Sequence, residues 1–213
     1  GENAPDFTII YEDRWSIVVD NPAELLSVPG RDPHNQDSVE SRLRLCLPEG
    51  MELKAVHRLD EDTSGLLVLA RDRDTYRHLS QQFARRQVRK VYEAVLSGHV
   101  AGDRGTIELP LWGNPENRPI QQVCWQRGKP SVTKFQVLER QALRTRVEFV
   151  PLTGRSHQLR VHAADRRGLA QPILGDRLYG GVPASRLHLH ARTLEFTHPQ
   201  SGKRLCFQAE MPF

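Results

Sequence analysis

Alternating apolar and polar positions predict strands at the start of the chain. TIIYED (8–13) and SIVVD (16–20) are rich in β-branched residues, and Asp13-Arg14 between them suits a tight connection. The following stretch, NPAELLSVPGRDP (21–33), contains three Pro and one Gly and is too broken for regular structure. We therefore expect two neighbouring strands and then an irregular loop.

Helical spacing first appears after this loop. Ser38 is a suitable N-cap, and Val39, Leu43 and Leu47 fall on one face of the helix that would follow it. Pro48 should end the helix, because proline cannot continue the hydrogen-bond pattern. The apolar face predicts a helix that packs against the core.

Two later segments also predict helices. DTYRHLSQQFARRQ (74–87) has Leu79 and Phe83 four residues apart among polar residues, which is typical of an amphipathic surface helix. SHQLRVHAADRR should form a helix with Ser156 near its N-cap and Gly168 as its stop.

Most of the remaining apolar runs are short and predict strands. They are VYEAVLSG (91–98), VTKFQVLE (132–139), RVEFVPL (146–152), RLHLHARTLEF (186–196) and KRLCFQA (203–209). The second and third should pair as antiparallel neighbours. Strands outnumber helices without regular βαβ alternation, so the pattern favours an α+β fold.

One apolar run stands directly after a cluster of charges. In HRLDEDTSGLLVLARD (57–72), a turn-forming Asp-Thr-Ser-Gly sequence leads into a strand that should be buried. This order would hold the carboxylate of Asp60 at the mouth of a rigid sheet. Alternatively, Arg58 pairs with Asp60 or Asp62 and only fastens a loop.

Length and composition are typical of a globular protein. With 213 residues, 38% hydrophobic and 26% charged, the chain can form one large domain or one sheet around two cores. No apolar run approaches the roughly 18 residues that span a bilayer, and we expect a cytosolic protein without a signal peptide. The three Cys are widely spaced and are expected to be buried thiols.

Positive charge is concentrated in two windows. The net charge is only +4, but 25 of the 30 basic residues are Arg, whose planar head suits phosphates and bases. Residues 83–92 hold four basic residues and no acid, and residues 154–168 hold four Arg and one Asp. Such windows indicate a polyanionic partner more strongly than the total charge does, although an isolated basic cluster is usually a solvated face. The excess of Arg over Lys can also reflect a GC-rich genome.

Several common chemistries lack their signatures here. The chain has no G-x-x-x-x-G-K-[ST], G-x-G-x-x-G, H-E-x-x-H or G-x-S-x-G, which argues against nucleotide hydrolysis, dinucleotide binding, zinc proteolysis and serine esterase chemistry. His188 and His190 alternate on one strand and could bind a metal, but no third ligand is apparent, so structural histidines are favoured.

The motif from His57 to Arg71 resembles the HRLDxxTSGLLVLAR signature of the RluA-type pseudouridine synthases. Further blocks resemble this family in the same order. They are LLSVPGR (25–31), RKVYEAVLSG (89–98), NRPIQQV with GKPSVT (117–133), PLTGRSHQLRVH (151–162), PILGDRLYG (172–180) and LHLHA (187–191). The loop NRPIQQV most resembles the RluA branch, which acts on ribosomal RNA and on tRNA anticodon stem-loops.

One position departs from this resemblance. The family commonly has Lys-Pro after its second strand, whereas this chain has Asn21-Pro22, followed by Glu24 where a small residue is frequent. If the usual Lys contacts RNA or steadies the catalytic loop, RNA affinity would be lower in this chain.

The resemblance implies a fold and a domain organisation. We expect the pseudouridine synthase fold, a bent, mostly antiparallel mixed sheet flanked by helices and loops around a central active-site cleft. Residues 1–213 should form a single catalytic domain without an S4 RNA-binding domain. The implied activity is the isomerisation of uridine to pseudouridine in ribosomal RNA, tRNA or both.

The resemblance also implies catalytic residues. Asp60 would be the catalytic carboxylate and Arg155 its partner, since a neighbouring guanidinium favours the charged form of an acid. Asp60 could attack C1′, add to C6 or remove the 2′ proton, and the sequence leaves all three open. Tyr92 would stack on the uracil, although without the family match it would be taken for a core tyrosine.

RNA contacts follow from the same resemblance. Arg58 would fill the space left when the target uridine flips out of the RNA. Leu66 and Leu159 would wall a dry pocket. The side chains expected to hold phosphates are Arg85, Arg86, Arg89, Lys90 and Arg160.

Two other functions remain as alternatives. One is a catalytically silent RNA-binding or chaperone module of the same fold, and the other is a hydrolytic nucleosidase that uses Asp60 to release free base. For the synthase we expect an RNA partner, no cofactor, no metal, no membrane association and a monomer.

Overall fold

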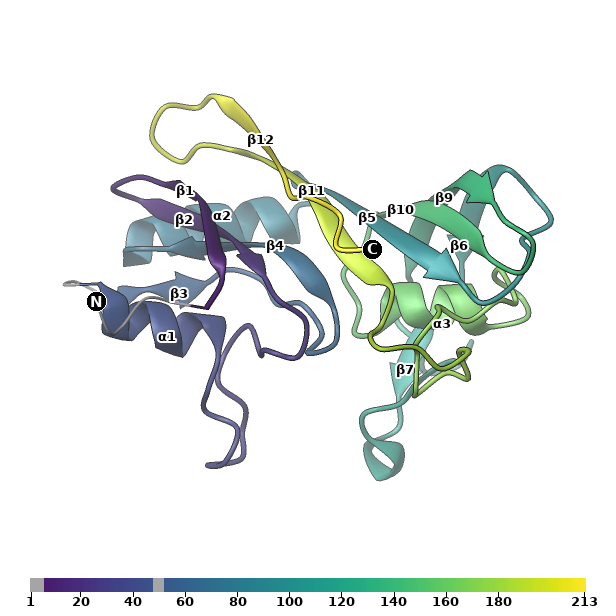
Figure 1. The fold of residues 1–213 in the computed structure, drawn as a ribbon. Coiled ribbons are helices and arrows are strands. Elements are labelled where there is room, and N and C mark those ends of the chain that lie inside the picture. Colours follow the sequence, from purple (N-terminus) through teal and green to yellow (C-terminus); the bar gives the residue numbers. More distant parts are fainter. Residues whose placement is uncertain (1–5, 48–51) are drawn as a thin grey trace. The chain divides into compact units, whose positions relative to one another are not determined.

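The computed structural model describes residues 6–47 and 52–213, which divide into two compact units (Figure 1). Unit 1 comprises the chain up to Arg89 together with Ala191–Pro212. Unit 2 comprises Lys90–His190 with Phe213. Each unit combines strands with helix and has an apolar core of its own.

Unit 1 is built on a sheet with the strand order β1-β2-β4-β11, in which β3 also pairs with β4 and β12 with β11. The pairs β1/β2, β2/β4, β3/β4 and β11/β12 are antiparallel. The elements are β1 (Thr8–Glu12), β2 (Ser16–Asn21), α1 (Val39–Cys46), β3 (Lys54–Ala55), β4 (Ser64–Ala70), α2 (Arg73–Ala84), β11 (Leu189–Thr197) and β12 (Arg204–Gln208).

Both faces of β4 are covered, which explains its continuous apolar run. Leu67 and Leu69 pack on one face with Val39 and Leu43 of α1. The alternate residues of β4 pack on the other face with Leu79 of α2. Every residue of β4 is therefore buried. This strand gives the loop before it a rigid attachment to the core.

Helix α1 begins at its predicted N-cap, whereas α2 begins one residue before and ends three residues before the predicted range of 74–87. The side chain of Ser38 accepts from the backbone N–H of Ser41, and the Ser41 hydroxyl accepts from the Ser38 N–H, which completes a capping box. The last helical residue, Cys46, precedes Leu47, and the expected stop at Pro48 lies outside the described residues. The N-cap of α2 is Asp72, whose carboxylate accepts from the N–H of Thr75.

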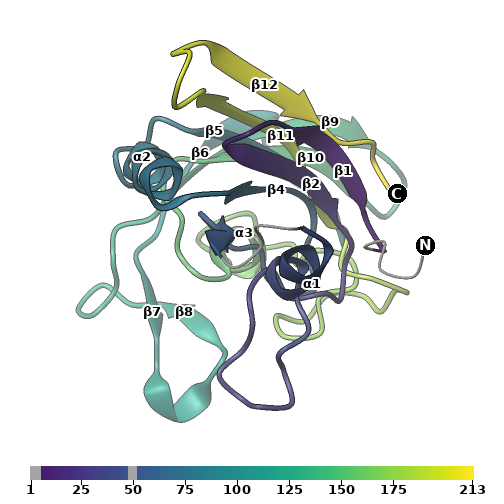
Figure 2. The same cartoon turned by 90° about the vertical axis from the view of Figure 1, so that its left-hand side faces the viewer.

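Unit 2 has the strand order β5-β10-β9-β6, and all three pairings are antiparallel. A second, two-stranded sheet joins β7 to β8, and Figure 2 shows it as a narrow hairpin. The elements are β5 (Arg89–Leu96), β6 (Arg104–Glu108), β7 (Leu111–Gly113), the short 3-10 helix η2 (Pro115–Asn117), β8 (Gln121–Val123), β9 (Val132–Arg140), β10 (Thr145–Pro151) and α3 (Gln158–Ala164). The predicted pairing of β9 with β10 is confirmed, whereas β6, β7 and β8 were not predicted.

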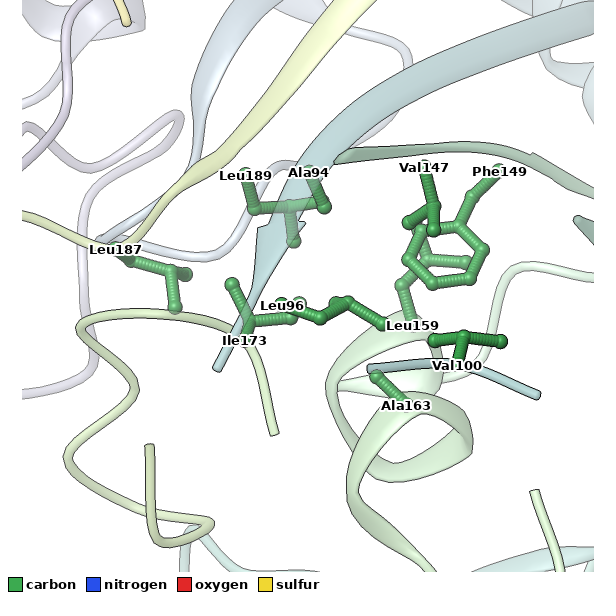
Figure 3. Packing of buried hydrophobic residues seen from close by; sticks show 10 residues of the cluster. All are labelled: Ala94, Leu96, Val100, Val147, Phe149, Leu159, Ala163, Ile173, Leu187 and Leu189. Atoms are coloured by element: carbon green, nitrogen blue, oxygen red, sulfur yellow. The ribbon is translucent and has the colours of Figure 1, made fainter. Parts of the chain in front are cut away.

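The core of unit 2 lies between α3 and the sheet. Figure 3 shows Leu159 and Ala163 of α3 beside Leu96 of β5 and Phe149 of β10. Of these four residues, Leu159 has the highest relative exposure, at 6%. Packing against these strands fixes the position of the loop that leads into α3.

Helix α3 is shorter than the sequence predicts. Its N-cap is His157 rather than Ser156, because His157 has a left-handed backbone with φ of 54° and separates Ser156 from the helix. At the other end the backbone is already extended at Asp165, so the helix stops before Gly168. Residues near helix ends follow local backbone geometry that periodicity does not encode.

The predicted α+β class is confirmed. Strands and three α-helices make up most of the regular structure of residues 6–47 and 52–213, and the strands pair mostly in antiparallel fashion. No helix in this part of the chain is long and apolar enough to cross a membrane.

Candidate active site

Asp60 lies in unit 1, in the loop that joins β3 to β4. Its backbone C=O accepts from the N–H of Thr63 at 2.9 Å, which closes a tight turn over Glu61 and Asp62. Its side chain is half-buried, and β4 begins directly after the turn. The turn therefore lies at Asp60–Thr63, earlier than the predicted Asp-Thr-Ser-Gly turn, because Ser64 and Gly65 already belong to β4.

The loop after β2 holds the backbone on both sides of Asp60. The Ser27 hydroxyl accepts from the Leu59 N–H at 3.0 Å and donates to the Leu59 C=O at 3.4 Å. The Glu24 N–H donates to the Glu61 C=O at 2.7 Å. Because these bonds fix the residues before and after Asp60, its carboxylate is presented from a preorganised turn.

His57 anchors the start of the same loop. Its Nε2 accepts from the N–H of Val68, in the middle of β4, at 3.1 Å. Its ring stacks on Phe83 of α2, with 4.6 Å between ring centroids and 21° between the planes. The sequence interpretation assigned His57 no role. Its place at the head of the charged motif was the available signal in the sequence, whereas its contact with Phe83 is known only from the structure.

Gly65 lets a neighbouring strand approach the turn closely. Its φ is 121°, a conformation that side chains rarely allow. A Cβ at this position would lie 2.3 Å from the carbonyl oxygen of Ala191 in β11. Only glycine therefore permits this backbone packing, five residues after Asp60.

Tyr92 lies in unit 2 on β5, where it pairs in register with Phe149 of β10 and packs partly against the core. Lys90 is two residues earlier and points to the same face of the strand. Its Nζ lies 3.4 Å from the position that a Cβ on Gly154 would take. Burial lowers the pKa of Lys90. Lys90 thus lies beside the loop that carries Arg155, and its contact with phosphate stays a prediction.

The loop before α3 holds Arg155 by both backbone and side chain. The Arg155 N–H donates to Oε1 of Gln158 at 3.1 Å, and its Nε donates to the C=O of Pro130 at 3.1 Å. Gln158 Oε1 also accepts from the hydroxyl of Thr153 at 2.6 Å. Gln158 is buried, and the sequence did not indicate this because the apolar residues of the segment have a mixed period.

The expectation that Arg160 binds phosphate is wrong. Its side chain is 2% exposed and makes a bidentate ion pair with Asp176, from Nε to Oδ2 at 3.0 Å and from Nη2 to Oδ1 at 2.7 Å. Both ends of the pair are enclosed, so this guanidinium is not available to RNA. Its partner lies 16 residues further along the chain, outside any local pattern.

The other expected RNA contacts differ in exposure. Leu66 and Leu159 are buried in apolar clusters of unit 1 and unit 2, and their role as pocket walls stays a prediction. The exposed candidates are Arg58, Arg85, Arg86 and Arg89. Their accessibility is compatible with phosphate or base contacts.

Asp60 belongs to unit 1, whereas Tyr92 and Arg155 belong to unit 2. The pairing of Asp60 with Arg155 and the central cleft therefore stay predictions. Within residues 6–47 and 52–213, no group of three His, Cys, Asp or Glu side chains has an arrangement that could hold a metal ion.

Curated relatives match the chain over nearly its whole length. It is 44% identical over 210 residues to the dual-specificity RNA pseudouridine synthase RluA of Yersinia pestis, covering 96% of this chain and 99% of the relative. It is 43% identical over 214 residues to the RluA of Escherichia coli strain K12, covering 98% and 95%.

Solved structures and a family model agree with these matches. Human RNA pseudouridylate synthase domain containing 1 is 30% identical with a TM-score of 0.80, covering 98% of this chain and 84% of that one. The RNA pseudouridylate synthase family model matches residues 16–165, which include Asp60, Tyr92 and Arg155. The chain therefore belongs to the RNA pseudouridylate synthase family.

Proposed function

We propose that this chain is an RNA pseudouridine synthase that isomerises specific uridines in ribosomal RNA, in tRNA anticodon stem-loops, or in both. The observation that carries the proposal is its similarity, over nearly the full length of both chains, to relatives named dual-specificity RNA pseudouridine synthases. We further expect a monomer that acts in the cytoplasm.

The reaction sets the chemical requirements of the site. The N1–C1′ bond of uridine breaks, the uracil turns, and a C5–C1′ bond forms while the proton on C5 moves to nitrogen. Atoms and electrons balance within the nucleoside, so the reaction requires neither a redox cofactor nor a metal. It requires a carboxylate near the sugar, an enclosed base and access to a flipped nucleotide.

In this proposal Asp60 is the catalytic carboxylate. It attacks C1′, adds to C6 or removes the 2′ proton, and each route needs an ionised oxygen beside the sugar. The turn that carries Asp60 supports the assignment, because its backbone is tied to Ser27 and Glu24 and little reorganisation is needed on binding. Arg155 would favour the ionised form of the carboxylate.

Tyr92 and Arg58 act on the target base in the same proposal. Tyr92 stacks on the uracil and assists proton removal from C5, and its half-buried position on β5 is compatible with this role. Arg58 is exposed two residues before Asp60, so its planar head can occupy the space that the flipped base leaves.

Substitution of Asp60 by Asn tests the function. The amide keeps the shape but lacks the charge, so we expect no detectable pseudouridine while RNA affinity stays within about threefold, a change of under about 0.7 kcal/mol. Carbodiimide modification with primer extension on ribosomal RNA and tRNA measures the product. Asp62→Asn, in the same turn, is the matched control and should keep activity.

The alternatives predict different products. Release of free uracil by the unsubstituted chain would identify a nucleosidase. RNA binding without any new primer-extension stop would identify a catalytically silent module. Undiminished pseudouridine formation by Asp60→Asn would remove Asp60 from the mechanism.

A further inference from the structure

A rigid turn of unit 2 presents a tryptophan to solvent. Residues 124–128, here called the Trp125 turn, follow β8 directly. The indole of Trp125 is 66% exposed, whereas Trp15 and Trp112 are half-buried. Figure 2 shows the hairpin of β7 and β8 from which this turn emerges.

Backbone hydrogen bonds hold both ends of the Trp125 turn. The Gly128 N–H donates to the Cys124 C=O at 2.8 Å, and the Cys124 N–H donates to the Pro110 C=O at 3.0 Å. Lys129 and Leu111 then exchange two bonds, of 2.8 and 3.0 Å. The loop is also tight, because a Cβ on Gly128 would lie 2.3 Å from the oxygen of Cys124. The indole is therefore exposed on a constrained backbone.

Positive charge surrounds this indole in the sequence. Residues 117–133 contain Arg118, Arg127 and Lys129 and no acidic residue, and all three side chains are exposed. The guanidinium of Arg127 lies 5.0 Å from the ring centroid of Trp112, a cation–π contact that limits its freedom. A single exposed aromatic has little meaning alone, but an aromatic among cations without acids matches a surface for unpaired nucleic acid.

We propose that Trp125 is a stacking platform for an unpaired base of the substrate RNA other than the target uridine, with Arg127 and Lys129 contacting the adjacent phosphates. This inference rests on the proposed function, which supplies RNA as the partner. An indole stacks on the face of any base, so the platform would tolerate sequence differences between RNAs. It would select unpaired loops over duplex, whose bases have no accessible face.

Fluorescence tests this proposal directly. In the Trp15→Phe, Trp112→Phe variant, Trp125 is the single indole of the chain. Titration with an RNA stem-loop should quench its emission in a saturable way, and the same RNA annealed to its complement should not. Quenching that is absent with the stem-loop, or equal with the duplex, would overturn the platform.

Affinity gives a second, independent measurement. Trp125→Ala should raise the Kd for the stem-loop by about 5- to 150-fold, the range expected for a lost base-stacking aromatic, whereas Trp125→Phe should stay near the parent value. Leu143→Ala is the matched control, since Leu143 is 78% exposed in the turn between β9 and β10. An unchanged Kd for Trp125→Ala would overturn the proposal and would fit a protein contact instead.

Failure of the platform and failure of the proposed function give different results. Pseudouridine formation by the unsubstituted chain is measured on the same stem-loop. Product formation with no effect of Trp125→Ala on Kd removes the platform and leaves the synthase intact. Quenching of Trp125 without any product supports the platform and removes the proposed activity.

Discussion

At the residue scale, the carboxylate of Asp176 organises much of unit 2. Besides its ion pair with Arg160, Asp176 accepts from the N–H of Leu178 at 3.0 Å. Tyr179, in the same loop, accepts from the N–H of Gln121 in β8 at 3.0 Å through its hydroxyl. One buried charge pair therefore links α3 to the loop that contacts the β7–β8 hairpin.

Substitution Asp176→Asn should destabilise the protein strongly. It leaves the Arg160 guanidinium buried without a countercharge, a change that typically costs about 3–5 kcal/mol. Urea unfolding measures the effect, with Asp165→Asn as the control because the pair of Asp165 with Arg167 is more exposed. The control should lose far less stability, and equal losses in the two variants would contradict the role of burial.

A second residue-scale feature is Asn21, where the family resemblance led us to expect a Lys. The side chain is fully buried at the end of β2. Neither polar atom of its amide has a hydrogen-bond partner among residues 6–47 and 52–213. Burying an amide without a hydrogen-bond partner lowers the free energy of unfolding. An apolar residue of similar size at this position would not have that cost.

Asn21→Leu should therefore stabilise the protein, because Leu has nearly the same size and no polar atoms to desolvate. We expect the free energy of unfolding to rise by about 1–3 kcal/mol in denaturant titrations. Asn114→Leu is the control and should destabilise, since Asn114 caps η2 by accepting from the Glu116 N–H. Destabilisation by Asn21→Leu would mean that the native amide is hydrogen-bonded.

At the element scale, one carboxylate joins two hairpins of unit 1. Asp13, in the turn between β1 and β2, accepts from the Tyr11 hydroxyl at 2.6 Å and from His198 Nε2 at 2.7 Å. Burial alone would raise the pKa of Asp13, but these bonds and two backbone N–H donors outweigh it and lower the pKa to about 2. The bond to Asp13, burial and the nearby negative charge raise the pKa of Tyr11 to about 12.

These shifts predict how stability depends on pH. The folded pKa of Asp13 lies below its ordinary value of 3.8, so its contribution is present above pH 4 and is lost as pH falls toward 2. The folded pKa of Tyr11 lies above 10.0, so its contribution is present below pH 10 and is lost as pH rises toward 12. Urea unfolding across pH measures both, and Asp13→Asn should flatten both limbs. If the Asp13→Asn variant loses stability at low and high pH as the parent does, Asp13 and Tyr11 are not the groups responsible.

At the scale of the whole molecule, the arrangement of charge matters more than its total. A net charge of +4 is a weak attraction for RNA, but Arg85, Arg86 and Arg89 stand together between the end of α2 and the start of β5. All three are exposed. Clustered cations release condensed counterions from RNA, which makes binding depend on salt.

Loss of two of these cations should change that salt dependence. Arg86→Ala with Arg89→Ala should weaken binding to all RNAs and lower the slope of log K against log salt by about 0.7–0.9 for each lost phosphate contact. The control is Arg104→Ala with Arg144→Ala, which removes the same charge from exposed positions elsewhere. An equal change of slope in both variants would mean that only the net charge matters and that Arg86 and Arg89 make no specific phosphate contacts.

The sequence by itself determined the features that depend on neighbouring residues. The N-cap of α1 at Ser38 and the buried run of β4 are encoded within a few positions, so capping preferences and the apolar pattern were sufficient. The antiparallel pairing of β9 with β10 follows from their short connection. The catalytic assignments came from family resemblance, because no local pattern distinguishes a catalytic Asp from one that fastens a loop.

Only the tertiary structure decided the features that depend on distant residues. The sequence predicts that an Arg in a basic window is exposed. Arg160 is nevertheless buried, because Asp176 from another segment forms an ion pair with it. Short strands such as β7 carry too few residues for periodicity, and they exist because Lys129 and Val123 pair with them. The partners that stabilise a buried charge or a short strand are supplied by folding, so a linear pattern does not contain them.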